Sequence, residues 1–473
     1  MIQRSRAYLD PDGLPSQKML QSALKEHLGR LPRLEKLRKY YEGDNDILQR
    51  RRASGLPNNR IAHPFGRYIA SVTAGYLIGQ PAAYTMDDGA PSETLDAIVD
   101  LYARSSMDSV DMENAHNAAV YGRGIEYVHV DADASPHATA LSPADAFVVY
   151  EDTYDMSPLF GVYIAPKLKE TGGADGFRVW VMTDRLIAEY YAKDLTVAEF
   201  SEVKRESHYF GGVPLVEYWN DEDERGDFEW VIPLIDAYDK LESDRVNDKE
   251  QYVDKLIVMT GCVLEKDDQG RTPGQQLRED KLLALPDSDA SVEYLSSALD
   301  EANVEVQRQA LEADIHKLSM VPDLTDREFA ANASGVAMRY KLWGLDQLIR
   351  IKERWFIEGL RSRLRLYAGF MAVKGFPAMD VAGVNITLSR SMPANTLEQA
   401  QIAQYAKAAD AASVRERVAI LHRGEGWTDD QIDADAERIR VESGDPLGQF
   451  GNIIPGDIMP QLEQQDRMMG DGA

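Results

Sequence analysis

The sequence contains almost none of the features that mark a secreted scaffold or a membrane protein. Its single cysteine, Cys262, cannot form an intramolecular disulfide, which excludes a disulfide framework. No run of about 18 apolar residues is present, so we expect no transmembrane helix. The N-terminus, Met1-Ile-Gln-Arg-Ser-Arg-Ala7, lacks an apolar signal core, and we expect synthesis in the cytosol.

Basic residues are scarce relative to acidic ones. The 52 lysines and arginines are outnumbered by 79 aspartates and glutamates, which gives a formal net charge of −27. Such a chain repels nucleic acids and anionic membranes at long range, so tight non-specific binding of either is disfavoured. This charge does not exclude DNA as a passing cargo. The 473 residues, 44% of them hydrophobic, suffice for two to four domains with sizeable cores.

The motifs that carry most enzyme chemistry are missing. We find no Gly-x4-Gly-Lys-Ser/Thr phosphate cradle, no His-Glu-x-x-His metal helix, no Gly-x-Ser-x-Gly nucleophile elbow and no Cys-x-x-Cys pair. The eight histidines are scattered without metal-ligand spacing, and Asp131-Ala-Asp133 lacks the later ligands of a calcium loop, which indicates a turn. We therefore predict no catalytic residue, no metal site and no cofactor.

Hydrophobic periodicity predicts an α+β fold that is mainly α. Leucines at helical spacing indicate a helix over 15–42, which Pro32 is expected to break into two pieces. Further helices are expected over 60–80 and 106–121. Closely spaced strand-like segments with turn residues between them predict an antiparallel sheet. These segments are 125–130, 146–150, 160–164, 177–182 and 187–191.

Long helices are expected in the second half of the chain. Pro233 suits a first helical turn, and the helix that follows, over 234–256, carries a thin apolar stripe and a strongly acidic face. Helices are also expected over 303–318 and 334–373. A short strand over 385–388 precedes Ala-rich helices that run to about residue 443, after which a Gly- and Pro-rich tail is expected to be mobile.

Two smaller features indicate contacts between subunits. The basic run Arg50-Arg51-Arg52 lies in an acidic protein, so a subunit contact is favoured over a nucleic-acid site. Trp343 and Trp355 lie in the apolar, aromatic helix 334–373 and are interpreted as core residues or subunit contacts.

Short motifs also follow one another in a characteristic order. They are Tyr40-Tyr-Glu-Gly-Asp-Asn-Asp-Ile47, Asn58-Asn-Arg-Ile61, Gly75-Tyr-Leu-Ile-Gly-Gln-Pro81, Leu234-Ile-Asp-Ala-Tyr-Asp-Lys240, Ser243-Asp244, Val321-Pro-Asp323, Asn332-Ala-Ser-Gly-Val-Ala337 and Pro393-Ala-Asn395. Each motif alone is weak, but the ordered combination, over roughly 35 to 440, resembles the portal proteins of long-tailed bacteriophages of Gram-positive hosts.

The resemblance implies a structural protein of the virion and not an enzyme. Its subunits would form a ring, of about twelve copies, at one capsid vertex, assembled in the host cytoplasm. Double-stranded DNA would be pumped in through the channel by a terminase ATPase and would leave by the same route. Capsid and scaffolding proteins and a head–tail connector or adaptor are the other implied partners, and no membrane is involved.

The resemblance also implies a division of the chain into named regions. These are an N-terminal wing part (1–232), a stem helix (233–256), a clip (257–298), a second stem helix (299–319), a tunnel loop (320–334), a second wing part (335–392), a crown (393–443) and a mobile tail (444–473).

Two groups of residues are predicted to act on the DNA. An acidic wall would keep the duplex centred without binding it, and it would comprise Asp236, Asp239, Glu242, Asp244 and Asp248. Helical spacing leaves open which of these carboxylates face the channel. The tunnel loop would approach the duplex with Pro322, Asp323, Asp326, Arg327, Glu328 and Asn332. Arg327 is the candidate for contacting phosphate.

Two other functions stay open at this point. A different head–tail adaptor or minor head protein would share the virion setting, although such chains are usually shorter or lack the paired stem helices. A soluble enzyme acting on a cationic or neutral substrate would need a cleft with converging carboxylates, which the motif search does not support.

Overall fold

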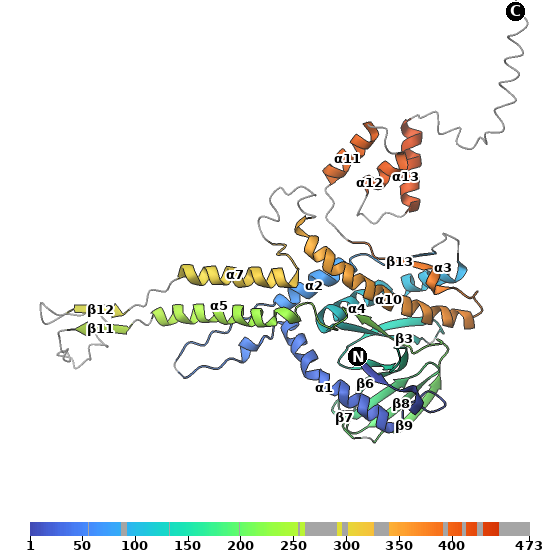
Figure 1. Cartoon of the computed structure of the whole chain (residues 1–473), viewed down its shortest axis with the longest axis horizontal. Helices are drawn as coiled ribbons and strands as arrows, with labels where there is room; N and C mark the ends of the chain where they lie inside the picture. Colours follow the sequence, from blue (N-terminus) through green and yellow to red (C-terminus); the bar gives the residue numbers. More distant parts are fainter. Residues whose placement is uncertain are drawn as a thin grey trace, which may run out of the picture.

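The computed structural model describes most of the chain up to residue 443. The described residues are 1–54, 56–86, 92–131, 133–197, 199–253, 256–260, 291–295, 301–325, 340–390, 396–408, 413–422 and 429–443. They form a body of helices and mostly antiparallel strands from which a pair of helices projects (Figure 1), which confirms the α+β class. Within these ranges, every helix is too short or too polar to cross a membrane.

The larger sheet has six strands in the order β1-β5-β6-β7-β8-β9. The neighbours from β5 to β9 are antiparallel, as predicted, whereas β1 pairs in parallel with β5. The strands are β1 (Ile2–Arg4), β5 (Ala146–Glu151), β6 (Pro158–Leu168), β7 (Ala174–Met182), β8 (Leu186–Ala192) and β9 (Ser201–Ser207). The predicted strands 146–150, 160–164, 177–182 and 187–191 correspond to β5, β6, β7 and β8. Strands β1 and β9 were not predicted.

Helix α1 (Gln17–Glu42) is continuous, so the predicted break at Pro32 is wrong. Proline removes one backbone hydrogen bond within a helix, which usually costs about 3 kcal/mol. The helix persists because its two halves are held in different cores. Leu20 and Leu24 pack on the six-stranded sheet, while Leu37 and Tyr40 lie in the larger core of the body.

The larger core is enclosed by helices and two small sheets. The order β10-β3-β4 forms one sheet, and β13 pairs with β2 in the other. The strands are β3 (Arg123–Val130), β4 (Pro136–Leu141), β10 (Leu215–Trp219), β2 (Ala83–Met86) and β13 (Val384–Thr387). The helices are α2 (Phe65–Leu77), α3 (Glu93–Arg104), α4 (Met107–Tyr121) and α10 (Trp343–Val373).

A glycine fixes the junction between α4 and β3. Gly122 has φ of 88°, and a Cβ there would lie 2.0 Å from the carbonyl oxygen of Glu224. Only glycine therefore allows the chain to reverse here while the segment before α5 packs against it.

Two helices project from the body side by side, as Figure 1 shows. They are α5 (Ile232–Val253) and α7 (Glu301–Ser319), close to the predicted 234–256 and 303–318. At the far end of the pair, β11 (Leu256–Thr260) and β12 (Ser291–Leu295) pair in antiparallel orientation.

Three helices follow the body at the C-terminal end of the described chain. They are α11 (Thr396–Ala408), α12 (Val414–Leu421) and α13 (Asp429–Ser443), in agreement with the predicted Ala-rich helices. Helix α12 begins at a capping box, in which Ser413 and Glu416 each accept the other's backbone N–H. The predicted tail, 444–473, lies outside the described residues.

Helix α10 brings two cations into the larger core. The Arg363 side chain, with no exposed surface, donates to Asp111 of α4, Glu126 of β3 and the hydroxyl of Tyr84 of β2. Three turns earlier, Lys352 donates to Asp227 at 2.5 Å, and both side chains of that pair are only 2% exposed.

The two tryptophans of α10 differ in environment. Trp355 stacks on Trp219 of β10, with ring centroids 5.4 Å apart. Trp343 is 61% exposed, so it is not a core residue of the subunit, whereas its neighbours Leu342 and Leu345 are buried in the larger core. The predicted start of this helix, 334–339, lies outside the described residues.

We predict that Arg363→Leu lowers the free energy of unfolding by about 3–5 kcal/mol, because it leaves the carboxylates of Asp111 and Glu126 buried without a cation. Denaturant unfolding followed by tryptophan fluorescence measures the loss. The matched control is Arg365→Leu, whose side chain is 55% exposed and should change stability by less than about 1 kcal/mol. Equal losses in the two variants would contradict the importance of the buried cation.

Candidate functional site

The helix pair α5–α7 contains the residues predicted to form the acidic wall. Ile232 and Ile235 of α5 are buried in the larger core, which anchors the start of the helix in the body. Beyond this base, one side of α5 faces α7 and the opposite side faces the loop between α1 and α2, residues 45–63. Each of these neighbours uses a different set of polar side chains of α5.

Asp239 is fully buried beneath the loop 45–63. Its Oδ1 accepts from the backbone N–H of His63 at 2.9 Å and lies 2.8 Å from that residue's ring Nδ1. Its Oδ2 accepts from the side-chain amide of Asn45 at 2.6 Å. The carboxylate has no exposed surface, so it holds the loop against the helix within the subunit and is not presented to solvent.

Asp236 is engaged one turn earlier. Its carboxylate accepts from the hydroxyl of Tyr40 on α1. Burial raises the pKa of Asp236, and the hydrogen bond from Tyr40 opposes this rise. Burial and the neighbouring carboxylate together raise the pKa of the Tyr40 hydroxyl, so it remains the donor. The pair ties the base of α5 to the end of α1.

Asp244 accounts for two arginines of the basic run. Arg50 donates to its Oδ1 at 2.6 Å, and Arg52 donates to the same oxygen. The contact that the structure shows for these two side chains lies within the subunit, and a contact of the basic run with another subunit stays a prediction. Local sequence patterns could not reveal this contact, because the partners are 194 and 192 residues apart.

Two uncharged residues of α5 complete the contact with the loop 45–63. Ser243 accepts from the backbone N–H of Ile61 at 3.0 Å, and Asn247 accepts from the backbone N–H of Asn59 at 2.7 Å. Together with Asp236, Asp239 and Asp244 they recur at helical spacing on one side of α5. The polar side chains on this face of α5 thus accept hydrogen bonds from backbone N–H groups of the loop 45–63, which would otherwise lack partners in a helix or sheet.

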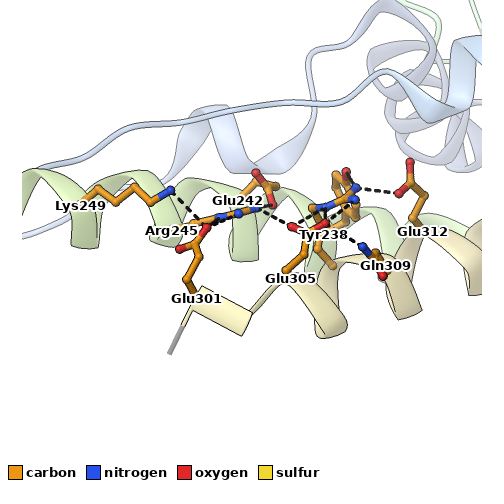
Figure 2. Close-up of polar contacts among 9 residues, drawn as sticks. Tyr238, Glu242, Arg245, Lys249, Glu301, Glu305, Gln309 and Glu312 are labelled. Carbon is orange, nitrogen blue, oxygen red and sulfur yellow. Dashed lines mark hydrogen bonds and ion pairs between the residues drawn. The ribbon is translucent and has the colours of Figure 1, made fainter. Parts of the chain in front are cut away.

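The opposite side of α5 binds α7 through charged side chains, which Figure 2 shows. Arg245 of α5 donates to Glu301 at 2.7 Å and to Glu305 at 3.1 Å, and it also donates to Glu242 on its own helix at 3.2 Å. Lys249 donates to Glu301 at 3.2 Å. One guanidinium thus links two turns of α7 to α5.

Arg308 of α7 is the second bridge. It donates to the hydroxyl of Tyr238 on α5 at 3.1 Å and to Glu312 at 2.6 Å, and it also binds Glu305. Hydrogen bonds from Arg308 and Gln309 lower the pKa of Glu305 to about 2, and those from Arg245 and Lys249 lower the pKa of Glu301. These carboxylates therefore stay ionised well into acidic conditions.

The five predicted wall residues are thus in different states. Asp236 and Asp239 act as acceptors inside the subunit, and Asp244 binds two arginines. Glu242 is 17% exposed and contacts Arg245. Asp248 is exposed on the outer half of α5. Whether any of them faces a channel stays a prediction.

The first part of the predicted tunnel loop lies at the base of α7. The hydroxyl of Tyr68 donates to the carbonyl of Pro322 at 2.8 Å and accepts from the N–H of Leu324 at 2.9 Å. Asp323 accepts from the N–H and hydroxyl of Thr325 at 2.8 and 2.7 Å. The segment 321–324 is therefore fastened to α2. The other predicted loop residues, Asp326, Arg327, Glu328 and Asn332, lie outside the described residues.

The contacts of α5 position the helix relative to the body. The predicted acidic residues are dispersed along two faces of a helix, and their partners are arginines, backbone N–H groups and a tyrosine of the same chain. Such contacts hold a helix at a fixed angle to the body, and they leave a charged surface toward the tip of the pair.

Comparison with known proteins identifies relatives over most of the chain. A family model described as "Phage portal protein, SPP1 Gp6-like" matches residues 20–445. The portal protein of Bacillus phage SPP1 is 23% identical over 385 residues, which cover 76% of this chain and 73% of the relative. The portal protein of Clostridium phage phiCD119 is 21% identical over 441 residues, which cover 85% and 89%.

Solved structures with a similar chain come from gene transfer agent particles. One belongs to the virion of a native particle, with 12% identity and a TM-score of 0.45 over 82% of this chain and 92% of that one. Another belongs to the neck of a native particle computed with C12 symmetry, with 12% identity and a TM-score of 0.43 over 76% and 89%.

We predict that acidification separates α7 from α5. The pKa of Glu305 is lowered from 4.5 to about 2, and that of Glu301 is also lowered from 4.5. Their stabilising contribution is therefore complete above about 4.5 and is lost as the pH falls through these lowered pKa values. Spin labels at the exposed Ala237 and Ala313, in a Cys262→Ser background, report the distance between the helices. Arg245→Gln should move the separation to higher pH with unchanged helix content by circular dichroism. Separation at the same pH in both proteins would contradict the role of Arg245.

Proposed function

The chain belongs to the phage portal protein family of the SPP1 Gp6-like type, and from that membership we propose that its copies close into a ring whose central channel passes double-stranded DNA. The protein is a portal protein, a structural component of a phage-type virion. The observation that carries the proposal is the projecting pair α5–α7, a long, rigidly braced and anionic unit within the region that the family model matches.

In the proposed map the pair α5–α7 is the stem. The antiparallel pair β11–β12 at its tip belongs to the clip. The wing is the body, residues 1–232 and 335–392, which contains α10, the two small sheets and the six-stranded sheet. Helices α11 to α13 form the crown. The stretch 320–334 is the tunnel loop, and Tyr68 holds its described part at Pro322 and Leu324. About twelve subunits complete the ring.

The proposed partners follow from this arrangement. A terminase ATPase pumps DNA through the channel during packaging, and a head–tail connector or adaptor later attaches to the same ring. Capsid and scaffolding proteins surround it at the vertex, and assembly takes place in the host cytoplasm. None of these steps assigns a chemical reaction to the portal itself.

The proposed acidic wall acts by weak repulsion. Helix α5 has six acidic and three basic residues and α7 has four acidic and two basic ones, which gives the pair a net charge of −5. Screening limits repulsion of a duplex to about 8–10 Å at physiological salt. The wall therefore keeps DNA off the channel surface without retarding it. Asp248 contributes most, because Asp244 is paired with Arg50 and Arg52 and Glu242 with Arg245, while Asp236 and Asp239 brace the helix from within.

The proposed function predicts that the purified protein forms closed rings. Head-to-tail contacts between identical subunits close into a ring when the rotation from one subunit to the next divides a full turn. Negative-stain images should show rings with a central hole, and light scattering should give a mass near twelve times 52.9 kDa. A protein that stays a compact monomer at every concentration and salt condition would overturn the proposed function.

The proposed function also predicts that the charge of the acidic wall affects DNA passage. Asp248→Lys should convert repulsion to attraction at each subunit, so that packaging slows and DNA is retained more strongly at low salt. Packaging rate and DNA retention are measured with assembled particles. Asp155→Lys, the same charge change at an exposed residue of the β5–β6 turn, is the matched control. If both variants package and retain DNA like the unmodified protein, the wall has no such role.

A further inference from the structure

Three side chains of types that bind metal ions converge where α7 ends at the body. Glu312 and His316 lie one turn apart on α7, Asp323 follows in the next segment, and one ligand atom of each lies within 4.8 Å of the others. The same three residues line a surface pocket of about 270 Å³. The remaining lining residues include His63, Phe65 and Tyr68.

The surroundings of His316 fix the orientation of its ring. Its Nδ1 lies 2.9 Å from the carbonyl oxygen of Val321. Because a carbonyl only accepts, Nδ1 carries the proton and Nε2 keeps its lone pair. Phe65 and Tyr68 meet the ring edge to face, with centroids 6.0 and 5.8 Å away. A histidine held through one nitrogen by a carbonyl is the usual form of a metal-ligating histidine.

The two carboxylates are oriented in a comparable way. Asp323 uses Oδ1 to accept from the N–H and hydroxyl of Thr325, and Glu312 uses Oε2 to accept from Arg308 at 2.6 Å. In both cases the described contacts involve one oxygen, and the second oxygen is left for a ligand. Contacts of this kind reduce the freedom that metal binding would otherwise remove.

The segment that carries Asp323 is held close to α7 independently of any metal. Tyr68 binds the backbone on both sides of it, at Pro322 and Leu324. The ligand set therefore needs only a small closure to reach the roughly 2.0–2.2 Å bonds of a zinc site.

We propose that Glu312, His316 and Asp323 bind one divalent transition-metal ion, with Zn²⁺ as the preferred ion. An imidazole among the ligands favours Zn²⁺ over Mg²⁺ or Ca²⁺, and two carboxylates complete a mixed nitrogen and oxygen set. Three protein ligands leave at least one coordination position for water, as in an open zinc site. This departs from the expectation of no metal site, because Asp323 joins the other two ligands only through the turn after α7.

The ion would fasten the end of α7 to the segment 321–324. If that segment begins a tunnel loop, which rests on the proposed function, the metal fixes the base from which the loop extends. The site itself does not depend on that role, because all three ligands come from one subunit.

The test is the binding of Zn²⁺ to the purified full-length chain after treatment with a chelator. Calorimetry and metal analysis should give one saturable site per chain, with Mg²⁺ much weaker. His316→Gln and Asp323→Asn should each weaken Zn²⁺ binding by at least about tenfold. In the unmodified chain, Zn²⁺ should also slow hydrogen exchange of the Leu324 amide.

The matched control is Asp314→Asn, which removes an exposed carboxylate from the other side of α7 and should bind Zn²⁺ like the unmodified chain. Circular dichroism without metal checks that the variants fold. If His316→Gln misfolds, Asp323→Asn still tests the site, because Asp323 lies outside any helix. Absence of saturable Zn²⁺ binding, or equal binding by all variants, overturns the proposal. Zn²⁺ binding can be measured without ring formation, so a negative result for the metal site leaves the proposed ring untested, and the reverse also holds.

Discussion

The buried charge of Arg363 is the constraint on which the subunit depends. Burial alone would lower the pKa of this guanidinium, but Asp111 and other partners raise it well above its usual value, so the side chain stays charged. A buried charge without partners costs several kcal/mol, and apolar neighbours cannot replace them. Helix α10 can therefore meet α4 and β3 in one position only, since any slide along its axis would separate Arg363 from Asp111 and Glu126. Apolar packing by itself tolerates such shifts better.

The same constraint sets the direction of the projecting helices. Hydrogen-bond donors of Asn45 and His63 enclose the Asp239 carboxylate, as carboxylate acceptors enclose the Arg363 guanidinium. The loop 45–63 lacks regular secondary structure over most of its length, so its backbone needs acceptors, and α5 supplies them. The consequence is that the angle between α5 and the body is fixed by hydrogen bonds at the base of the helix. A channel built from many copies requires this, because a small change in that angle is multiplied along the helix.

Local patterns predicted the elements well and their partners poorly. The spacing of apolar residues located α5, α7 and α10, and alternation located β3 and β5 to β8, because both signals depend on neighbours within a few residues. Pro32 was misjudged because α1 is held by two cores that its own sequence does not reveal. Asp239 and Asp248 are both acidic residues of one helix, and nothing near them distinguishes the buried one from the exposed one. Their difference comes from Asn45 and His63, which are more than 170 residues away.

The acidic residues of α5 become more exposed from the base of the helix toward its tip. The same residue type therefore braces the helix at its base and contributes charge to the surface near its tip. The side chain of Asp239 has no exposed surface, that of Asp244 is 29% exposed, and Asp248 is exposed outright. Near the base, carboxylates meet backbone N–H groups and arginines of the same chain, so they contribute rigidity and little external field. Toward the tip these partners end, and the same residue type contributes charge to solvent. The net charge of −27 is therefore a poor measure of what a passing duplex would meet. The field is concentrated where the helices have left the body, and there a repulsive surface can act without loosening the base that supports it.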